Sequence, residues 1–156
     1  GTNTTTFSTT GGGAALGAVT GNIADQWYLE EAKLKTKAFV SFDFDQDKFL
    51  KDAIIGQAKN PDSPFEIINW SLNEPAPERE WKKKARARIK QADVVLVLVG
   101  TETHKASGVL AEIAIAREEG IPIVQIKGYE KKVCKPIPNA GRYYRWTWDN
   151  LKKLLR

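Results

Sequence analysis

The stretch ADVVLVLVG, residues 92–100, constrains the fold of this chain more than any other feature of its sequence. Its apolar residues do not alternate with polar ones, as they do in a strand that has one face in water. A continuous apolar run of this length is typical of a strand covered by helices on both faces, as in a parallel sheet. The run therefore predicts a layered α/β domain with this strand in its interior.

The sequence around this run alternates between strand and helix patterns. Runs of β-branched and aromatic residues predict three further strands: KAFVSF (37–42), FEIINW (65–70) and IPIVQI (121–126). Helical periodicity predicts four helices, over residues 45–59, 78–90, 107–119 and 147–156. Strand–helix alternation with short connections predicts right-handed βαβ units, and hence a doubly wound parallel sheet of four to five strands with helices on both faces. The central strand is expected to be 94–99 or 38–42.

Several residues at the helix ends support these limits. Gly120 stands where a helix commonly closes in the left-handed conformation, and Thr147 is a good N-cap for the last helix. One of Asp45 and Asp47 is expected to cap the first helix in the same way. The buried face of that first helix is predicted to carry Phe49, Leu50, Ala53, Ile54 and Ala58.

Residues 1–36 differ in composition from the rest of the chain. The tract GTNTTTFSTTGGGAALGAVTGN can bury little apolar surface, so it is predicted to be a tail or linker, followed by a possible short helix over residues 24–35. The Gly11–Gly13 run is not expected to bind a nucleotide, because no strand precedes it and the G-x-G-x-x-G spacing is missing. The folded domain is therefore expected to span residues 37–156.

Composition argues against several classes of protein. Cys134 is the only cysteine, so no internal disulfide can form and a reducing compartment, the cytoplasm, is expected. A single histidine and a single cysteine make a metal site of these residues unexpected. The longest weakly polar run, residues 11–24, is too short and too rich in glycine to span a membrane.

The net charge of +5 raises the question of nucleic acid, and much of it lies in EREWKKKARARIK, residues 78–90. On a helix, Trp81, Ala85 and Ile89 form one apolar stripe while the basic side chains point elsewhere. This is the pattern of a solvated amphipathic helix, and no nucleic-acid-binding motif accompanies it. Nucleic acid is not expected as a partner.

Functional residues are expected where the parallel strands end, because α/β sheets bind ligands at the carboxyl edge. Three segments reach that edge: SFDFDQD (41–47), NWSLNEP (69–75) and GTETHKASG (100–108). Their aromatic side chains could stack on a flat ring and their polar ones could donate or accept hydrogen bonds. Instead of binding a ligand, Trp70 could belong to the core and His104 to the polar surface. The candidate binding residues are Phe42, Asp43, Phe44, Trp70, Ser71, Thr103, His104 and Ser107.

Glu112 is the candidate for chemistry. No residue three or four positions away along its helix is basic, so a local ion pair does not explain it. Gly108, one turn earlier, leaves space beside the carboxyl group. An acid next to an opening at the ligand edge suits chemistry on a cationic or oxocarbenium-like centre. The alternative is a surface glutamate favoured by the helix dipole.

Together, KAFVSFDFDQD, NWSLNE and the segment 92–126 resemble the TIR-like domain of the Thoeris ThsB and MTH538-like group, over about residues 37–128. The motif is A-D-V-V-x-V-L-x-G-x-x-T with a glutamate twelve residues after the glycine. The resemblance implies a flavodoxin-like fold and, in catalytic members, cleavage of NAD at the nicotinamide–ribose bond, sometimes with cyclisation to a signal in antiviral defence. NAD would then be the substrate, with no separate cofactor.

The family's catalytic glutamate falls on Glu112, and its polar and aromatic residues after the first strand fall on Phe42 and Asp43. Many relatives carry a tryptophan where this chain has Gly108. The same segment is more loosely similar to nucleoside deoxyribosyltransferases, which also act on an N-glycosidic bond. A non-catalytic, self-assembling interaction module is the contrasting alternative, and the resemblance predicts a homo-oligomer in either case.

Overall fold

The computed structural model describes residues 35–68 and 78–156, which belong to one compact unit, Lys35–Arg156. The predicted tail and short helix lie outside the described residues, as do Trp70 and Ser71. No helix in the described ranges is long and apolar enough to cross a membrane. The elements, in chain order, are β1 (Thr36–Ser41), α2 (Lys48–Ala58), β2 (Phe65–Ile67), α3 (Glu78–Ile89), β3 (Val94–Val99), η2 (Thr103–Lys105), α4 (Ser107–Glu118), β4 (Ile123–Lys127), β5 (Arg142–Arg145) and α5 (Trp148–Leu154).

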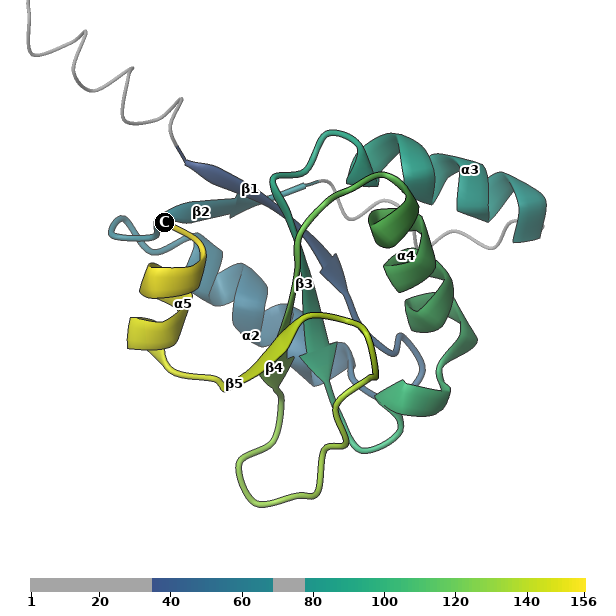
Figure 1. Ribbon diagram of the computed structural model, residues 1–156. Helices are drawn as coiled ribbons and strands as arrows, with labels where there is room; N and C mark the ends of the chain where they lie inside the picture. The colour runs from purple at the N-terminus through teal and green to yellow at the C-terminus, as the bar shows by residue number, and fades with distance from the viewer. Residues whose placement is uncertain (1–34, 69–77) are drawn as a thin grey trace, which may run out of the picture. The chain divides into compact units, whose positions relative to one another are not determined.

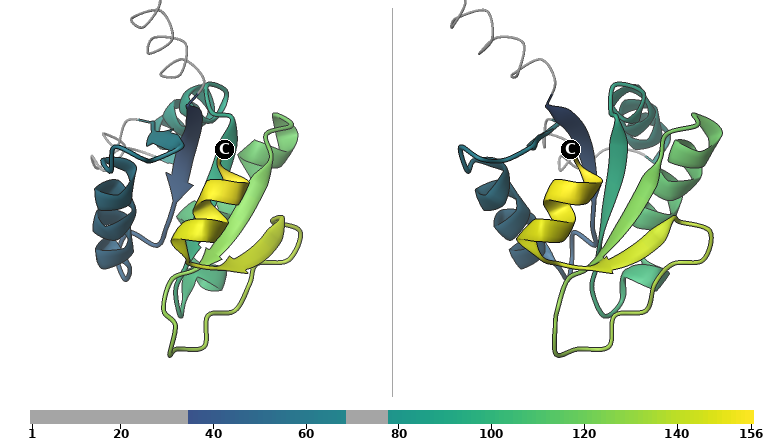
Figure 2. Two further views of the ribbon diagram at one scale, coloured as in Figure 1. Left: turned by 90° about the vertical axis from the view of Figure 1, so that its left-hand side faces the viewer. Right: turned by 60° about the vertical axis from the view of Figure 1, so that its left-hand side comes forward.

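The five strands form one sheet in the order β2-β1-β3-β4-β5, and every pairing is parallel (Figure 1). This is the flavodoxin-like strand order, and its switch point lies between β1 and β3. The predicted doubly wound α/β fold is confirmed, and β3 is the central strand. Helices α3 and α4 cover one face of the sheet, and α2 and α5 cover the other (Figure 2).

Strand β3 supplies side chains to both halves of the core. Val95, Val97 and Val99 pack under α3 and α4. The alternate residues Val94, Leu96 and Leu98 pack under α2 and α5. All six are buried, as expected for a strand whose side chains alternate between two helix-covered faces.

Three predicted details differ from the structure. Strand β5, RYYR, was not predicted, because it is a polar edge strand that pairs only with β4. Helix α2 begins at Lys48 rather than residue 45. Phe49 was expected on its buried face but is 73% exposed, whereas Leu50 and Ile54 are buried.

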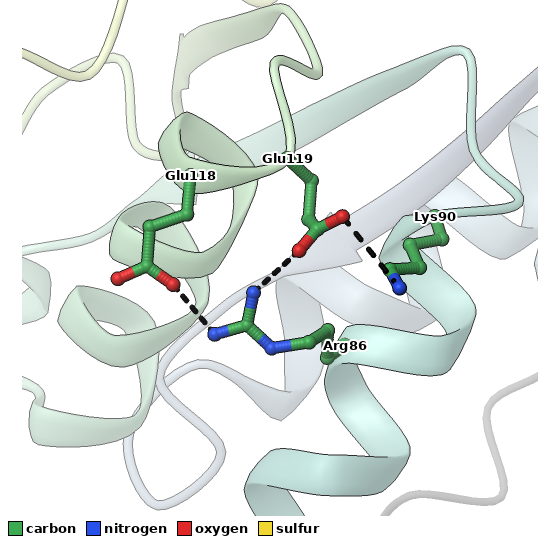
Figure 3. A network of polar contacts seen from close by, with 4 residues as sticks. All are labelled: Arg86, Lys90, Glu118 and Glu119. Carbon is green, nitrogen blue, oxygen red and sulfur yellow. Dashed lines mark hydrogen bonds and ion pairs between the residues drawn. The ribbon is translucent and has the colours of Figure 1, made fainter.

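Helix α3 is held to α4 by a buried stripe and a partly exposed ionic network. Ala85 and Ile89 are buried, in agreement with the predicted stripe. On the surface, Arg86 donates hydrogen bonds to Glu118 and Glu119, each at 2.5 Å, and the Lys90 ammonium lies 3.8 Å from the second oxygen of Glu119 (Figure 3). Basic residues predicted to face solvent therefore also join α3 to the end of α4.

Helix α4 ends as Gly120 predicts. The glycine has φ +71°, its N–H donates to the carbonyl of Arg117 at 3.2 Å, and the N–H of Ile121 donates to Ala116 at 2.9 Å. These two bonds form a Schellman motif, which satisfies the last carbonyl groups of the helix. At the other end of the domain, Thr147 caps α5 by accepting a hydrogen bond from the N–H of Asn150 at 3.0 Å.

A pair of glycine substitutions tests this helix stop. A Cβ added at Gly120 or at Gly56 would meet nothing within 4 Å, so only the backbone conformation separates the two positions. Gly120→Ala is expected to destabilise the domain by roughly 1–2 kcal/mol, because φ is positive. Gly56→Ala, inside α2, is expected to stabilise it by roughly 0.5–1 kcal/mol. Urea unfolding at equilibrium measures both, and a shift of the same sign in the two variants would contradict the argument.

Candidate functional site

A cavity of about 300 Å³ opens at the switch point of the sheet, where ligands bind in this class of fold. Its walls come from the end of β1 and the loop after it, from α3 and from the start of α4. The volume lies at the lower end of the range for ligand pockets, which is about 300–1,000 Å³. Four aromatic residues and a buried acid line it, namely Phe39, Phe42, Phe44, Trp81 and Glu112.

Glu112 is buried, with 8% of its surface exposed, and it projects from the second turn of α4. The hydroxyl of Ser41, the last residue of β1, donates a hydrogen bond of 2.6 Å to its Oε1. Burial raises the pKa of Glu112 to about 8, and the hydrogen bond from Ser41 lowers this pKa in part. At pH 7 the carboxyl group is therefore mostly protonated, and a cation placed beside it would favour the ionised form.

The aromatic side of the cavity is formed by rings from two elements. Phe42 and Phe44 follow β1, with centroids 6.1 Å apart and planes inclined by 48°. The ammonium group of Lys48 lies 4.8 Å from the centroid of the Phe44 ring. Trp81, near the start of α3, is half-buried and completes this side. Such a surface suits a planar ring.

The structure brings five of the predicted site residues to this cavity. Glu112 and the half-buried Asp43 line it, together with Phe42, Phe44 and Ser107. Thr103 and His104 lie in η2 and are not among the lining residues. Trp70 and Ser71 are outside the described residues. A role in ligand binding stays a prediction for all of them.

Thr103 instead belongs to a buried network around Asp47. Tyr129 donates a hydrogen bond of 2.8 Å to one oxygen of Asp47, and Thr103 donates one of 3.3 Å to the other. The N–H of Gly100 donates to the Thr103 hydroxyl at 2.7 Å. The predicted capping role is therefore wrong for the Asp47 side chain: it occupies the N-cap position of α2 but makes no capping hydrogen bond. It joins the segments that follow β1, β3 and β4.

Two residues of the site were not recognised in the sequence. Ser41 was treated only as the end of a strand, and Trp81 only as part of an apolar stripe. Since Ser41 is 71 positions from Glu112, no local spacing signals their contact. Trp81 could have been recognised from its position: it is the first residue of the apolar stripe Trp81, Ala85 and Ile89, on a helix that borders the ligand-binding edge of the sheet. In residues 35–68 and 78–156, no group of three or more His, Cys, Asp or Glu side chains could hold a metal ion.

The fold and this site together define a class: a flavodoxin-like α/β domain with a buried glutamate beside the switch point. Residues 39–132 match the family model described as Thoeris protein ThsB, TIR-like domain. The match covers more than half of the chain and includes every residue that lines the cavity. The chain therefore belongs to the Thoeris ThsB TIR-like domain family. A comparison with curated proteins returns no match.

The pKa of Glu112 predicts how stability depends on pH. Below the ordinary value of 4.5 the carboxyl is protonated both in the folded and in the unfolded chain. Between 4.5 and about 8 only the folded state keeps the proton, so the free energy of unfolding falls as pH rises, and the loss is complete above about 8. The limiting slope is about 1.4 kcal/mol per pH unit.

Glu112→Gln removes this ionisation. Between pH 5.5 and 7.5 the free energy of unfolding of wild type is expected to fall by roughly 2–3 kcal/mol relative to that of the variant, because each pH unit contributes up to about 1.4 kcal/mol. Ser41→Ala is the matched control: it removes the hydrogen bond but keeps the buried acid, so the pH dependence should persist. Urea unfolding across this range measures the difference, and parallel profiles for wild type and Glu112→Gln would show that the acid titrates normally.

Proposed function

We propose that this domain binds NAD and cleaves the bond between nicotinamide and ribose, with Glu112 as the catalytic residue. The observation that carries the proposal is the buried carboxyl group of Glu112 in a cavity walled by aromatic rings at the switch point. Membership of the TIR-like family supports the same reaction class. Nicotinamide is a flat ring, which the aromatic side of the cavity can accommodate.

The position of the acid suits the charge that develops in this reaction. In NAD the positive charge is on the pyridinium ring, and as nicotinamide leaves, it moves to the ribosyl carbon and ring oxygen. A carboxylate close to the ribose stabilises that transition state more than the ground state, which is the requirement for catalysis. The effect is larger inside a buried site than in water, because the local dielectric constant is lower.

Burial of Glu112 also sets the form in which the acid acts. Its pKa of about 8 means that the protonated form predominates at pH 7. A bound pyridinium cation favours the carboxylate, so NAD binding would release a proton from Glu112. Binding of NAD thus converts Glu112 to the carboxylate, which is the form that stabilises the transition state.

The size of the cavity indicates which part of NAD lies inside. A volume of about 300 Å³ suits the nicotinamide and its ribose, with the diphosphate and adenosine extending over the edge of the sheet. Asp43 and Ser107 offer hydrogen-bonding groups for the ribose hydroxyls and the carboxamide. Hydrolysis follows if water reaches the ribosyl carbon, and cyclisation follows if the adenine end folds back and excludes water.

The primary test is to incubate wild-type protein with NAD and follow nicotinamide, ADP-ribose and its cyclic isomers by chromatography. Glu112→Gln is expected to lower turnover by about 100-fold or more, comparable to the loss of one electrostatic stabiliser. The control is Glu102→Gln, an exposed acid beyond the end of β3 whose loss should leave turnover unchanged. Full activity of Glu112→Gln would remove the glutamate from the mechanism.

Two outcomes of the same assay would favour the alternatives. Absence of nicotinamide release at high protein concentration would favour a non-catalytic interaction module. Release of a free base from 2′-deoxynucleosides, with NAD left intact, would favour deoxyribosyltransferase-like chemistry. Each outcome identifies a different class of function from one set of substrates.

The pH profile provides a second prediction. Because the ionised form of Glu112 binds the cation, kcat/KM is expected to rise by up to tenfold per pH unit from pH 6 and to level off above about 8. Initial rates at NAD concentrations far below KM measure this profile. A value of kcat/KM that falls over the same range would mean that the protonated acid is the active form.

The single thiol, Cys134, is in keeping with a reducing cytoplasm.

The family resemblance also predicts self-association. Sedimentation velocity with and without NAD tests this prediction. A monomer under both conditions would contradict it.

A further inference from the structure

Trp81 and Gly108 face each other across the boundary between α3 and α4. A Cβ added at Gly108 would lie 3.7 Å from Cζ2 and 3.8 Å from Cη2 of Trp81, which is ordinary van der Waals distance. Both residues line the same cavity as Glu112, which is one helical turn after Gly108. The indole of Trp81 therefore lies against the bare backbone at the start of α4, on the side of the cavity that holds the acid.

The place of Trp81 is set by the packing of its helix. Ala85, one turn further along α3, is buried against the core, and so is Ile89. On the outer side, Arg86 links α3 to Glu118 and Glu119 at the end of α4 (Figure 3). Trp81 itself is only half-buried, so part of its ring surface is available to the cavity.

We propose that Trp81 is a specificity-determining residue, whose indole is the surface on which the nicotinamide ring stacks and which selects the oxidised, cationic dinucleotide over the reduced one. This inference rests on the proposed NAD cleavage. Tryptophan is the best aromatic partner for a cation, and the pyridinium ring of NAD is both flat and cationic. The dihydropyridine ring of NADH is neutral and lacks that attraction.

Phe44 is a weaker partner for such a cation than Trp81. Its ring already has the Lys48 ammonium at 4.8 Å from the centroid. A second positive charge near the same ring would be repelled by this lysine, and Phe44 is also 38% exposed at the mouth of the cavity. Trp81 is therefore the stronger candidate of these two rings for a cationic ligand.

The test uses the Glu112→Gln protein, so that binding is measured without turnover. The probes are nicotinamide mononucleotide and its reduced form, titrated by calorimetry. Adding Trp81→Ala is expected to raise the Kd of the oxidised probe by about 5- to 150-fold, the range for one base stacked on an aromatic side chain. The preference for oxidised over reduced probe should fall by about 2- to 30-fold, which corresponds to the cation–π contribution.

A further variant separates stacking from a structural role. Trp81→Phe keeps an aromatic ring and should recover most of the affinity for the oxidised probe. Equal weakening of both probes by Trp81→Ala would overturn the inference, because a general structural loss does not depend on the charge of the ring.

The outcomes also separate this inference from the proposed function. If neither the wild-type nor the Glu112→Gln protein bound the probes or NAD, both proposals would fall. If the Glu112→Gln protein bound them and Trp81→Ala left every Kd unchanged, only the role of Trp81 would be wrong. Fluorescence provides an independent reading: the oxidised probe should quench emission in the Trp146→Phe control but much less in Trp81→Phe, since Trp146 lies against Gln57 in another part of the domain.

Discussion

The domain depends on the burial of β3 from both sides. Its six residues carry no polar side chain, so neither face of the strand can meet water without a large loss of hydrophobic stabilisation. This requirement places α3 and α4 on one face and α2 and α5 on the other. It also fixes where the site can be, because β1 and β3 then end side by side at the switch point, with the first turns of α4 above them.

The site combines one acid held in an unfavourable environment with a rigid frame around it. Burying Glu112 costs stability at neutral pH, and the Ser41 hydroxyl offsets this cost in part by donating a hydrogen bond to it. Burial also raises the pKa of Asp47, but Tyr129 and Thr103 both donate hydrogen bonds to this carboxyl group, and it joins three loops at the edge. A buried acid whose pKa is strongly raised and that lines a cavity is typical of functional sites.

The sequence predicted those features that follow from local physics. The central strand, the stop at Gly120 and the cap at Thr147 each depend on residues close together in the chain. The edge strand β5 was missed because a single pairing partner leaves it polar and without an apolar pattern. Asp47 was misassigned because its partner Tyr129 is 82 positions away. Glu112 was found by the absence of a local partner, whereas Ser41 and Trp81 required the packing of distant elements.

The contacts that hold α3 differ in kind from those that hold the loops at the sheet edge. Asp47 and Thr103 are buried, while the pairs between Arg86 and α4 are partly exposed to solvent. Dissolved salt weakens exposed pairs over a screening length of about 8 Å at physiological ionic strength and affects buried ones much less. Salt therefore weakens the ionic links on the side of the cavity that carries Trp81 more than it weakens the contacts of Asp47 on the loop side.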